Sequence, residues 1–591
     1  MNRNRMNAKV EIKDFKGTLV KLVNYCKPFI IPIVISVILA ICASICAIIG
    51  PNKLQDLTNI ITKGILTGID INGVKKVFIT LLIIYILSFV FNYVQGFIMT
   101  IVSNKISKTL RSEISLKINR LPLRYFDKTS YGDILSRVTN DVAMIGNNLS
   151  DSVSTLFSSV VLLIGVVIMM FVTNYIMAIT AILSTIIGFS LMTLILKNSQ
   201  KYFVMQQKEL GNLNGHIEEV YSGHNIVKVY NAEEDVNKEF QDINDKLYKS
   251  SRKSYFLSSL MPQIMNFNGN FSYVCICVVG ASLVISGEVL IGTIVAFMLY
   301  TRLFTSPLIN ISNVFMSLQT LVAAGERVFT FLEEEEMSLE KNTKKLNKKS
   351  AKGNITFKDV HFAYDEEPII KGFNANVKKG QKIAIVGPTG AGKTTIVNLL
   401  MKFYDISSGD IIIDGISIKD LSRKNIHDLF VMVLQDTWVF NGTIYDNIVY
   451  NNKNVSLDDV KNVCEKVGLD HYIKTLPDGY NTILDDDVLS SGEKQLLTIA
   501  RAMLKDSPFL ILDEATSNVD TRTEELVQIA MDKLMKGKTS FIIANRLSTI
   551  KNADLILVLK DGNIIEQGTH EELLSLGGFY EELYNSQFEE V

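Results

Sequence analysis

The strongest chemical signal in the sequence is a glycine-rich loop between two apolar runs. Residues 382–386 are typical of a strand, residues 387–394 read Gly-Pro-Thr-Gly-Ala-Gly-Lys-Thr, and an apolar run typical of a helix continues to Leu400. Glycines let consecutive backbone N–H groups surround phosphate oxygens at the start of a helix, where the helix dipole favours anions. Because strand, loop and helix occur in the required order, the pattern predicts a phosphate-binding site rather than a chance glycine-rich turn.

The loop also predicts which side chains contact the phosphates. Lys393 is expected to reach the β- and γ-phosphates of a nucleotide, and Thr394 is expected to hold Mg²⁺. The other expected contacts within the loop and the start of its helix are Gly387, Thr389, Gly390, Gly392 and Thr395.

A second apolar run, Phe509–Leu512, ends in two acidic residues. A buried parallel strand at this position would deliver Asp513 to the magnesium shell and Glu514 to an attacking water. Two acids at the solvated end of an ordinary strand are the alternative. The phosphate loop about 120 residues upstream favours the catalytic interpretation.

These motifs lie in the C-terminal part of a chain whose first 325 residues are dominated by long uncharged runs. A bilayer core about 30 Å thick needs about 20 apolar helical residues to cross it. The runs predict an all-α domain of six membrane spans, at about 28–49, 77–104, 152–172, 176–196, 256–285 and 289–312. The whole chain has 60 Lys and Arg against 61 Asp and Glu, so no basic excess indicates nucleic-acid binding. The six cysteines lie mostly in apolar stretches without ligand spacing, and we expect neither disulfides nor a metal site among them.

Lys and Arg set the orientation, because they concentrate on the cytoplasmic side of membrane proteins. Segments 105–150 and 197–253 are rich in them, whereas the short turns near 174 and 287 have none. We therefore expect both segments to be cytoplasmic helical extensions, reversed near Tyr131-Gly132-Asp133 and Ser222-Gly223-His224. Arg302, within the sixth span, either reaches the cytoplasmic edge or faces a substrate pathway.

The resulting domain order is a cytoplasmic segment (1–27), a transmembrane domain (28–325), a linker (326–352) and an α/β phosphate-loop ATPase domain (353–591). The expected location is the plasma membrane, with the ATPase domain in the cytoplasm. In this order and spacing the motifs resemble those of an ATP-binding cassette (ABC) half-transporter, an exporter with six spans fused to one nucleotide-binding domain.

The resemblance covers nearly the whole chain and implies further site residues. It implies that Tyr364 stacks on adenine and that Gln435 is both a magnesium ligand and a catalytic residue, together with Glu514 and Asn545. The signature-like Leu489-Ser490-Ser491-Gly492-Glu493 would place Ser490, Gly492 and Glu493 on the ATP of a second domain, and a D-loop would end at Asp520. One chain has a single phosphate loop and a single signature, so the resemblance implies a dimer with Mg²⁺ and ATP between its halves.

Three positions depart from the family pattern. Asn545 stands where the family has a switch histidine, Ser491 and Glu493 replace a glycine and a glutamine of the signature, and Asp485-Asp486-Asp487 replaces a glutamate- and glycine-containing segment. Because an amide gives no proton and carries no charge, a site with Asn545 is expected to bind ATP well and to hydrolyse it slowly. A heterodimer with one impaired site is the favoured interpretation. An engineered substitution and ordinary variation in a homodimer stay open.

The expected activity is ATP-driven export of an amphipathic small molecule or lipid by alternating access. By resemblance, Thr129–Ile134 and Gly223–Val229 act as coupling helices seated beside Gln435 and Trp438. An ATP-gated channel or a non-transporting sensor shares every ATP motif and is the main alternative. An importer is disfavoured because the spans are fused to the ATPase, and the six spans exclude a soluble DNA-repair ATPase.

Overall fold

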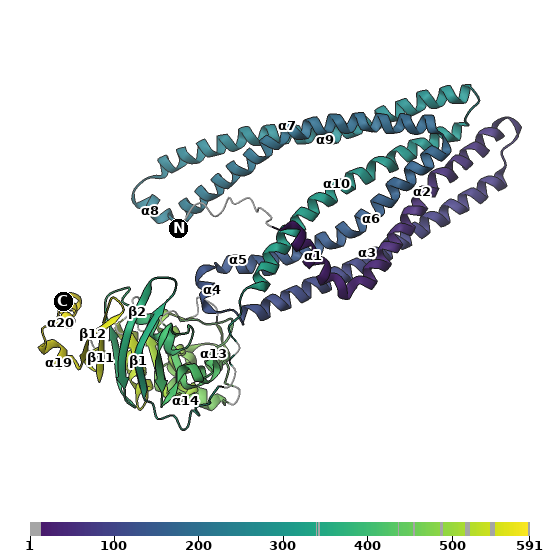
Figure 1. Ribbon diagram of the computed structural model, residues 1–591. Coiled ribbons are helices and arrows are strands. Elements are labelled where there is room, and N and C mark those ends of the chain that lie inside the picture. Colours follow the sequence, from purple (N-terminus) through teal and green to yellow (C-terminus); the bar gives the residue numbers. More distant parts are fainter. Residues whose placement is uncertain are drawn as a thin grey trace. The chain divides into compact units, whose positions relative to one another are not determined.

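In the computed structural model the chain forms two compact units, one of membrane helices and one α/β domain (Figure 1). The structure describes residues 14–338, 340, 343–434, 437–452, 455–484, 489–513, 521–543 and 550–588. The first unit contains residues up to Asn119 and Tyr131–Glu334. The second contains Arg120–Ser130 and the chain from Glu335 onward, so a short piece of the first cytoplasmic extension belongs to the α/β unit.

In the described residues of the first unit, all regular secondary structure is helical. Its elements are α1 (Phe15–Cys26), η2 (Lys27–Phe29), α2 (Ile30–Thr67), α3 (Ile71–Ile118), α5 (Tyr131–Ser136), the π-helical turn η3 (Arg137–Asp141), α6 (Val142–Thr173), α7 (Tyr175–Ser222), α8 (His224–Val229), α9 (Glu233–Ile285) and α10 (Ile291–Glu333). Within the described part of the chain, six helices are long and apolar enough to cross a membrane. This confirms the expected number of spans.

The turns between the spans follow from local sequence. Asn174 separates α6 from α7, and its side chain accepts a hydrogen bond from the backbone N–H of Met177 at 3.0 Å. Gly287, with φ +78°, lies between α9 and α10. Both turns lie where the sequence predicts them. The expected turn at Tyr131-Gly132-Asp133 is wrong: these residues begin helix α5, and the chain turns at the extended Thr129 instead.

Two bundles are recognisable within the first unit (Figure 1): α7 runs along α9, and α2, α3, α6 and α10 pack together. A buried cluster that includes Met170, Met177 and Phe297 joins them near the outer turns. A polar contact between α10 and α2 accompanies this cluster. The hydroxyl of Tyr300 donates a hydrogen bond to the side-chain oxygen of Asn52 at 3.1 Å. Inside a bilayer such pairing satisfies polar groups that lipid cannot.

The second unit is an α/β domain with two main sheets. Its strands are β1 (Ile355–Ala363), β2 (Pro368–Val377), β3 (Lys382–Val386), β4 (Ser408–Ile413), β5 (Ile416–Ser417), β6 (Phe430–Val433), β7 (Gly442–Thr443), β8 (Ile483–Leu484), β9 (Phe509–Asp513), β10 (Thr539–Ile543), β11 (Leu555–Lys560) and β12 (Asn563–Gly568). Its helices are α4 (Leu123–Lys128), α11 (Lys393–Leu400), η4 (Ile418–Asp420), α12 (Arg423–Leu429), α13 (Ile444–Val449), α14 (Leu457–Val467), α15 (Asp470–Thr475), η5 (Gly479–Asn481), α16 (Ser491–Lys505), α17 (Thr521–Met535), α19 (His570–Ser575) and α20 (Phe579–Phe588).

The larger sheet has the strand order β12-β11-β3-β10-β9-β6, with the five strands from β11 to β6 parallel. The parallel strands read as continuous apolar runs because helices cover both faces of such a sheet. A four-stranded antiparallel sheet, β2-β1-β4-β5, accompanies it. The phosphate loop leaves β3 and Asp513 ends β9, so the expected α/β fold brings both motifs to the same edge of one sheet.

Helix α10 continues to Glu333, into the range assigned from sequence to the linker. The chain beyond it is held against the α/β domain. The backbone N–H of Met337 donates to the carbonyl of Arg120 at 2.9 Å, and that of Lys344 donates to the carbonyl of Asp420 at 2.8 Å. The Glu340 carboxylate accepts from Lys402 at 3.2 Å and from Arg423 at 3.3 Å. The segment after α10 is therefore bound to the domain that it enters.

Candidate functional site

The glycine-rich loop has the backbone conformations that its sequence requires. Gly390 has φ +87° and Gly392 has φ +100°, both in the left-handed region that favours glycine. Gly392 directly precedes α11, whose N-terminus faces the loop. A β-carbon at Gly387 would lie 2.2 Å from the carbonyl oxygen of Leu559, so only glycine fits there. The loop is therefore built as a backbone cradle, which suits the phosphates of a nucleotide.

Lys393 places its cation over this cradle. Its ammonium donates to the carbonyls of Gly387 at 2.6 Å and Pro388 at 3.2 Å. Burial lowers the pKa of Lys393, while the Asp513 carboxylate opposes that shift. Thr394 is exposed at the start of α11, whereas Thr395 is only 6% exposed. The side chain of Thr395 therefore belongs to the core, and its backbone N–H is the group that remains for a phosphate.

Asp513 reaches the same edge of the sheet from β9. Ile543 in β10 is paired with Ile385 on one side and with Asp513 on the other, so these three residues form one row across the sheet. The phosphate loop begins two residues after Ile385. A threonine hydroxyl and a carboxylate are hard oxygen donors, which Mg²⁺ prefers. Thr394 and Asp513 thus fit the expected magnesium ligands in chemistry and in position.

Tyr364 follows β1 and is fixed by neighbouring aromatic rings. The rings of Phe362 and Tyr404 lie 4.9 Å from it, centroid to centroid, each meeting it edge to face. Its hydroxyl accepts a hydrogen bond from Asn398 of α11 at 3.3 Å. Tyr364 stays partly exposed. A rigid, partly exposed aromatic ring tied to the phosphate-loop helix is suited to stacking on a nucleobase.

The signature residues form the start of α16. Ser490 is its N-cap, and Ser490 and Glu493 close a capping box. The hydroxyl and the backbone N–H of Ser490 both donate to Glu493 Oε2 at 2.8 Å, while the backbone N–H of Glu493 donates to Ser490 Oγ at 3.3 Å. Gly492 is buried in the first turn. In a single chain the two side chains expected to bind a partner's ATP thus bind each other.

Helix α4 docks beside the expected adenine site. Arg124 and Lys128 pair with Asp365 at 3.0 and 2.6 Å, one residue after Tyr364. The hydroxyl of Tyr404 donates to the carboxylate of Asp127. Hydrogen bonding to Lys128, with Arg124 adding to it, lowers the pKa of Asp365. Within the second unit, α4 is therefore held at Asp365 and Tyr404, and it lies N-terminal to the expected tip at Thr129–Ile134.

Several predicted residues lie outside the described part of the chain, namely Gln435, Asp485-Asp486-Asp487, Glu514, Asp520 and Asn545. Their roles stay predictions. Trp438, the expected neighbour of a coupling helix, is described, and its ring lies 5.8 Å from that of Phe440 and 6.4 Å from that of Tyr450.

Sequence reasoning missed the docking residues Arg124, Lys128, Asp365 and Tyr404. No local pattern marks them, because the paired residues are 237 to 277 positions apart. The capping box did carry a signal: a serine followed three residues later by glutamate is a known helix-start pattern.

Family models match both halves of the chain. The model for the ABC transporter transmembrane region matches residues 33–308, and the ABC transporter model matches residues 370–517. The second match contains the phosphate loop, Asp513 and the signature.

Curated relatives match nearly the whole chain. A fatty acid ABC transporter ATP-binding/permease protein of Mycobacterium bovis is 40% identical over 90% of this chain and 84% of its own length. A probable multidrug resistance ABC transporter ATP-binding/permease protein of Bacillus subtilis is 35% identical, over 85% of this chain and 75% of its own. An ATP-dependent lipid A-core flippase of Syntrophus aciditrophicus is 33% identical, over 87% and 86%. The chain belongs to the ABC transporter family: it is a half-transporter of the plasma membrane, in which one transmembrane region and one cytoplasmic ATPase domain couple ATP hydrolysis to transport.

Proposed function

We propose that this chain is one half of a dimeric exporter that moves an amphipathic lipid or a similar amphiphile out of the inner leaflet by alternating access. The observation that carries this proposal is the presence, in one chain, of the phosphate cradle at Gly387–Lys393 and six helices able to span a membrane. The names of two relatives, a fatty acid transporter and a lipid A-core flippase, support a lipid-like cargo.

Half-transporters of this family dimerise, and the single phosphate loop and single signature of this chain explain why. Each ATP would lie between the phosphate cradle of one half-transporter and the signature of the other. ATP then draws the two ATPase domains together, and product release lets them part. To shift the membrane helices from 1:99 to 99:1 between two states, ATP must favour one state by about 5.5 kcal/mol.

In the proposed reaction, water attacks the γ-phosphorus, the bond to the ADP oxygen breaks, and ADP and phosphate leave. Lys393 offsets charge on the β- and γ-phosphates, Glu514 orients the water, and Gln435 lies beside it. Thr394 and Asp513 would hold Mg²⁺, which supplies positive charge to the phosphate oxygens when bound. The backbone carbonyls of the cradle hold Lys393 in place before the reaction, so this cation needs little reorganisation.

We propose that Asn545 makes the ATP site of this chain hydrolyse ATP more slowly than the second ATP site of the dimer. Its amide can donate to a γ-phosphate oxygen but has no proton to exchange. A heterodimer, with a partner that supplies a competent second site, agrees with this chemistry and is favoured over a homodimer.

Glu493→Gln is expected to strengthen ATP-dependent dimerisation. A serine hydroxyl has one proton, and in the single chain Ser490 donates it to the Glu493 carboxylate. The neutral amide oxygen of glutamine accepts this hydrogen bond more weakly than the carboxylate does. The substitution also removes a negative charge from the place where the partner's γ-phosphate should lie. The difference between a charged and a neutral hydrogen bond is about 1 kcal/mol, so the ATP concentration for half-maximal dimerisation should fall about fivefold.

The matched control for Glu493→Gln is Glu572→Gln, because Thr569 and Glu572 form the same capping box at α19. Dimerisation would be followed by light scattering during ATP titration. Equal effects of the two substitutions would show that only helix stability had changed, and would remove the proposed role of Ser490.

Asp365→Asn is expected to uncouple transport from ATP hydrolysis. It weakens both ion pairs that hold α4, which continues the chain from α3 toward α5. Solvent screens exposed ion pairs, so the effect should be moderate: the amount transported per ATP should fall about threefold while the ATPase rate stays within about twofold. Glu366→Gln changes the adjacent exposed carboxylate and should leave the ratio unaltered. A proportional fall of both rates would mean that α4 does not transmit the motion.

Uphill movement of substrate into sealed vesicles separates an exporter from an ATP-gated channel or a sensor. The proposed exporter accumulates a lipid probe against its gradient only with Mg·ATP. Equilibration without accumulation would replace the exporter with a channel.

A further inference from the structure

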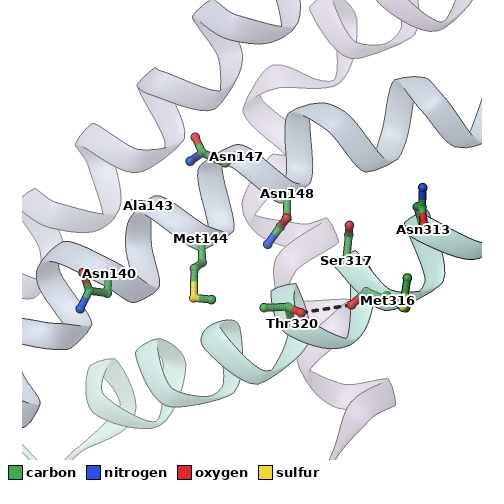
Figure 2. Close-up of a pocket in the computed structure, with 9 residues that line it drawn as sticks. All are labelled: Asn140, Ala143, Met144, Asn147, Asn148, Asn313, Met316, Ser317 and Thr320. Carbon is green, nitrogen blue, oxygen red and sulfur yellow. Dashed lines mark hydrogen bonds between the residues drawn. The ribbon is translucent and has the colours of Figure 1, made fainter. Parts of the chain in front are cut away.

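The first unit contains a groove of about 830 Å³ between α6 and α10, with η3 at one end (Figure 2). Most of its lining side chains are neutral hydrogen-bonding groups: Asn140, Asn147, Asn148, Asn313, Ser317 and Thr320. Met144 from α6 and Met316 from α10 add flexible apolar surface to the lining. Amides and hydroxyls both donate and accept hydrogen bonds, and methionine adapts to irregular apolar groups.

One end of the groove is expected at the depth of lipid head groups. Asn148 comes four residues before the expected span at 152–172, which is about 6 Å at 1.5 Å per residue. Thr320 lies eight residues beyond the expected span at 289–312, or about 12 Å. Each head-group layer of a bilayer is about 5–7 Å thick. Because α10 leads into the cytoplasmic ATPase domain, the groove begins at the inner leaflet and extends into the cytoplasm.

No lining residue of the groove carries a charge. The neighbouring Arg327 is committed to Asp141, which is only 4% exposed: Arg327 Nε donates to one carboxylate oxygen at 2.8 Å, and a terminal nitrogen donates to the other. Asp151, one turn nearer the membrane, is exposed and acidic. An anionic head group would therefore meet no cation among the lining residues and would lie near the negative charge of Asp151.

We propose that this groove binds the uncharged, hydroxyl- or amide-bearing head group of a membrane amphiphile and selects such molecules over anionic ones. The asparagine, serine and threonine side chains exchange hydrogen bonds with the head group, and the first carbons of the apolar chain contact Met144 and Met316. This inference rests on the proposed export of an amphiphile and specifies its substrate class.

The test compares two lipid probes with the same fluorescent acyl chains in vesicles that contain the dimeric transporter. One probe is a monoglucosyl diacylglycerol and the other is phosphatidic acid. ATP-dependent movement is followed by loss of accessibility to a membrane-impermeant quencher. The wild type is expected to move the sugar lipid about tenfold faster than the phosphate lipid. Asn148→Lys should shift that ratio about tenfold toward the phosphate lipid, because it supplies the missing cation.

Asn104→Lys is the matched control, because Asn104 is an exposed asparagine of α3 outside the groove lining. It should leave the ratio unchanged. Asn148→Asp keeps the size of the side chain and should slow the phosphate lipid further, which tests the idea even where the lysine variant fails to fold. A wild type that prefers the phosphate lipid, with both Asn148 variants unchanged, would overturn the selectivity while export stands.

Binding is measured separately, without ATP, by photolabelling with a photoreactive glucosyl diacylglycerol. Labelled peptides from α6 or α10 are expected, and excess unlabelled sugar lipid should remove the label. If the wild type moves neither probe but is labelled in the groove, the proposed export fails and the binding site stands. Absence of labelling would overturn the site itself. Cross-linking of position 144 to another protein chain instead of to lipid would also overturn it.

Discussion

Replacing Lys393 with alanine should abolish ATP-dependent closure of the dimer and lower the ATPase rate at least about a hundredfold. The lysine cation lies over the loop, 2.6 Å from the Gly387 carbonyl, in the cradle where the phosphates are expected to bind. Its pKa is lowered by burial, so the protein has already desolvated this cation. The half-buried ammonium attracts the phosphates. Solvent that enters after its removal does not restore an equal electrostatic attraction.

The control for Lys393→Ala is Lys379→Ala, which removes an exposed lysine from the turn before β3 and should leave both activities near wild type. Nucleotide binding is read by a fluorescent ATP analogue and closure by light scattering. Undiminished nucleotide binding and transport in Lys393→Ala would refute the assignment of the loop.

Asn545→His should raise the ATPase turnover of the dimer, with a gain of up to about a hundredfold at the site formed by this chain. A histidine at this position can hydrogen-bond the γ-phosphate and also exchange a proton during the reaction. Both side chains can donate a hydrogen bond to the γ-phosphate, so ATP binding itself should stay within about twofold of wild type.

Asn563→His, on an exposed position of β12, controls for the introduction of a histidine and should change nothing. Turnover is measured with the true partner chain present, because a heterodimer has two unequal sites. An unchanged rate in Asn545→His would mean that this site was never the slow one and would leave ordinary variation as the explanation of Asn545.

The local parts of the fold were predictable because they depend on neighbouring residues. The phosphate loop lies between β3 and α11, Asp513 ends β9, and the chain turns at Asn174, each as its sequence pattern indicates. The lengths of the apolar runs were enough to predict the six spans. A backbone segment that crosses lipid must satisfy its hydrogen bonds internally, and an α-helix does so.

The docking of α4 was not predictable, because it depends on residues that only the tertiary fold brings together. Asp365 gains its partners from a helix more than 230 residues earlier in the chain. The turn expected at Gly132 failed for a different reason: glycine permits a turn but does not require one, and here it continues in helix α5. The groove between α6 and α10 likewise depends on how two distant helices pack.

The most direct test follows the distance between this chain and its partner half-transporter, each carrying one spin label, across the native dimer in lipid nanodiscs. A spin label at position 221, an 84% exposed residue at the cytoplasmic end of α7, reports on the membrane helices rather than on the ATPase domains. If ATP-driven pairing rearranges these helices, Mg·ATP will shift the measured distances to shorter values, and Lys393→Ala will prevent the shift. The same distances with and without Mg·ATP, or a chain that stays monomeric in both, would contradict ATP-driven pairing as the source of transport.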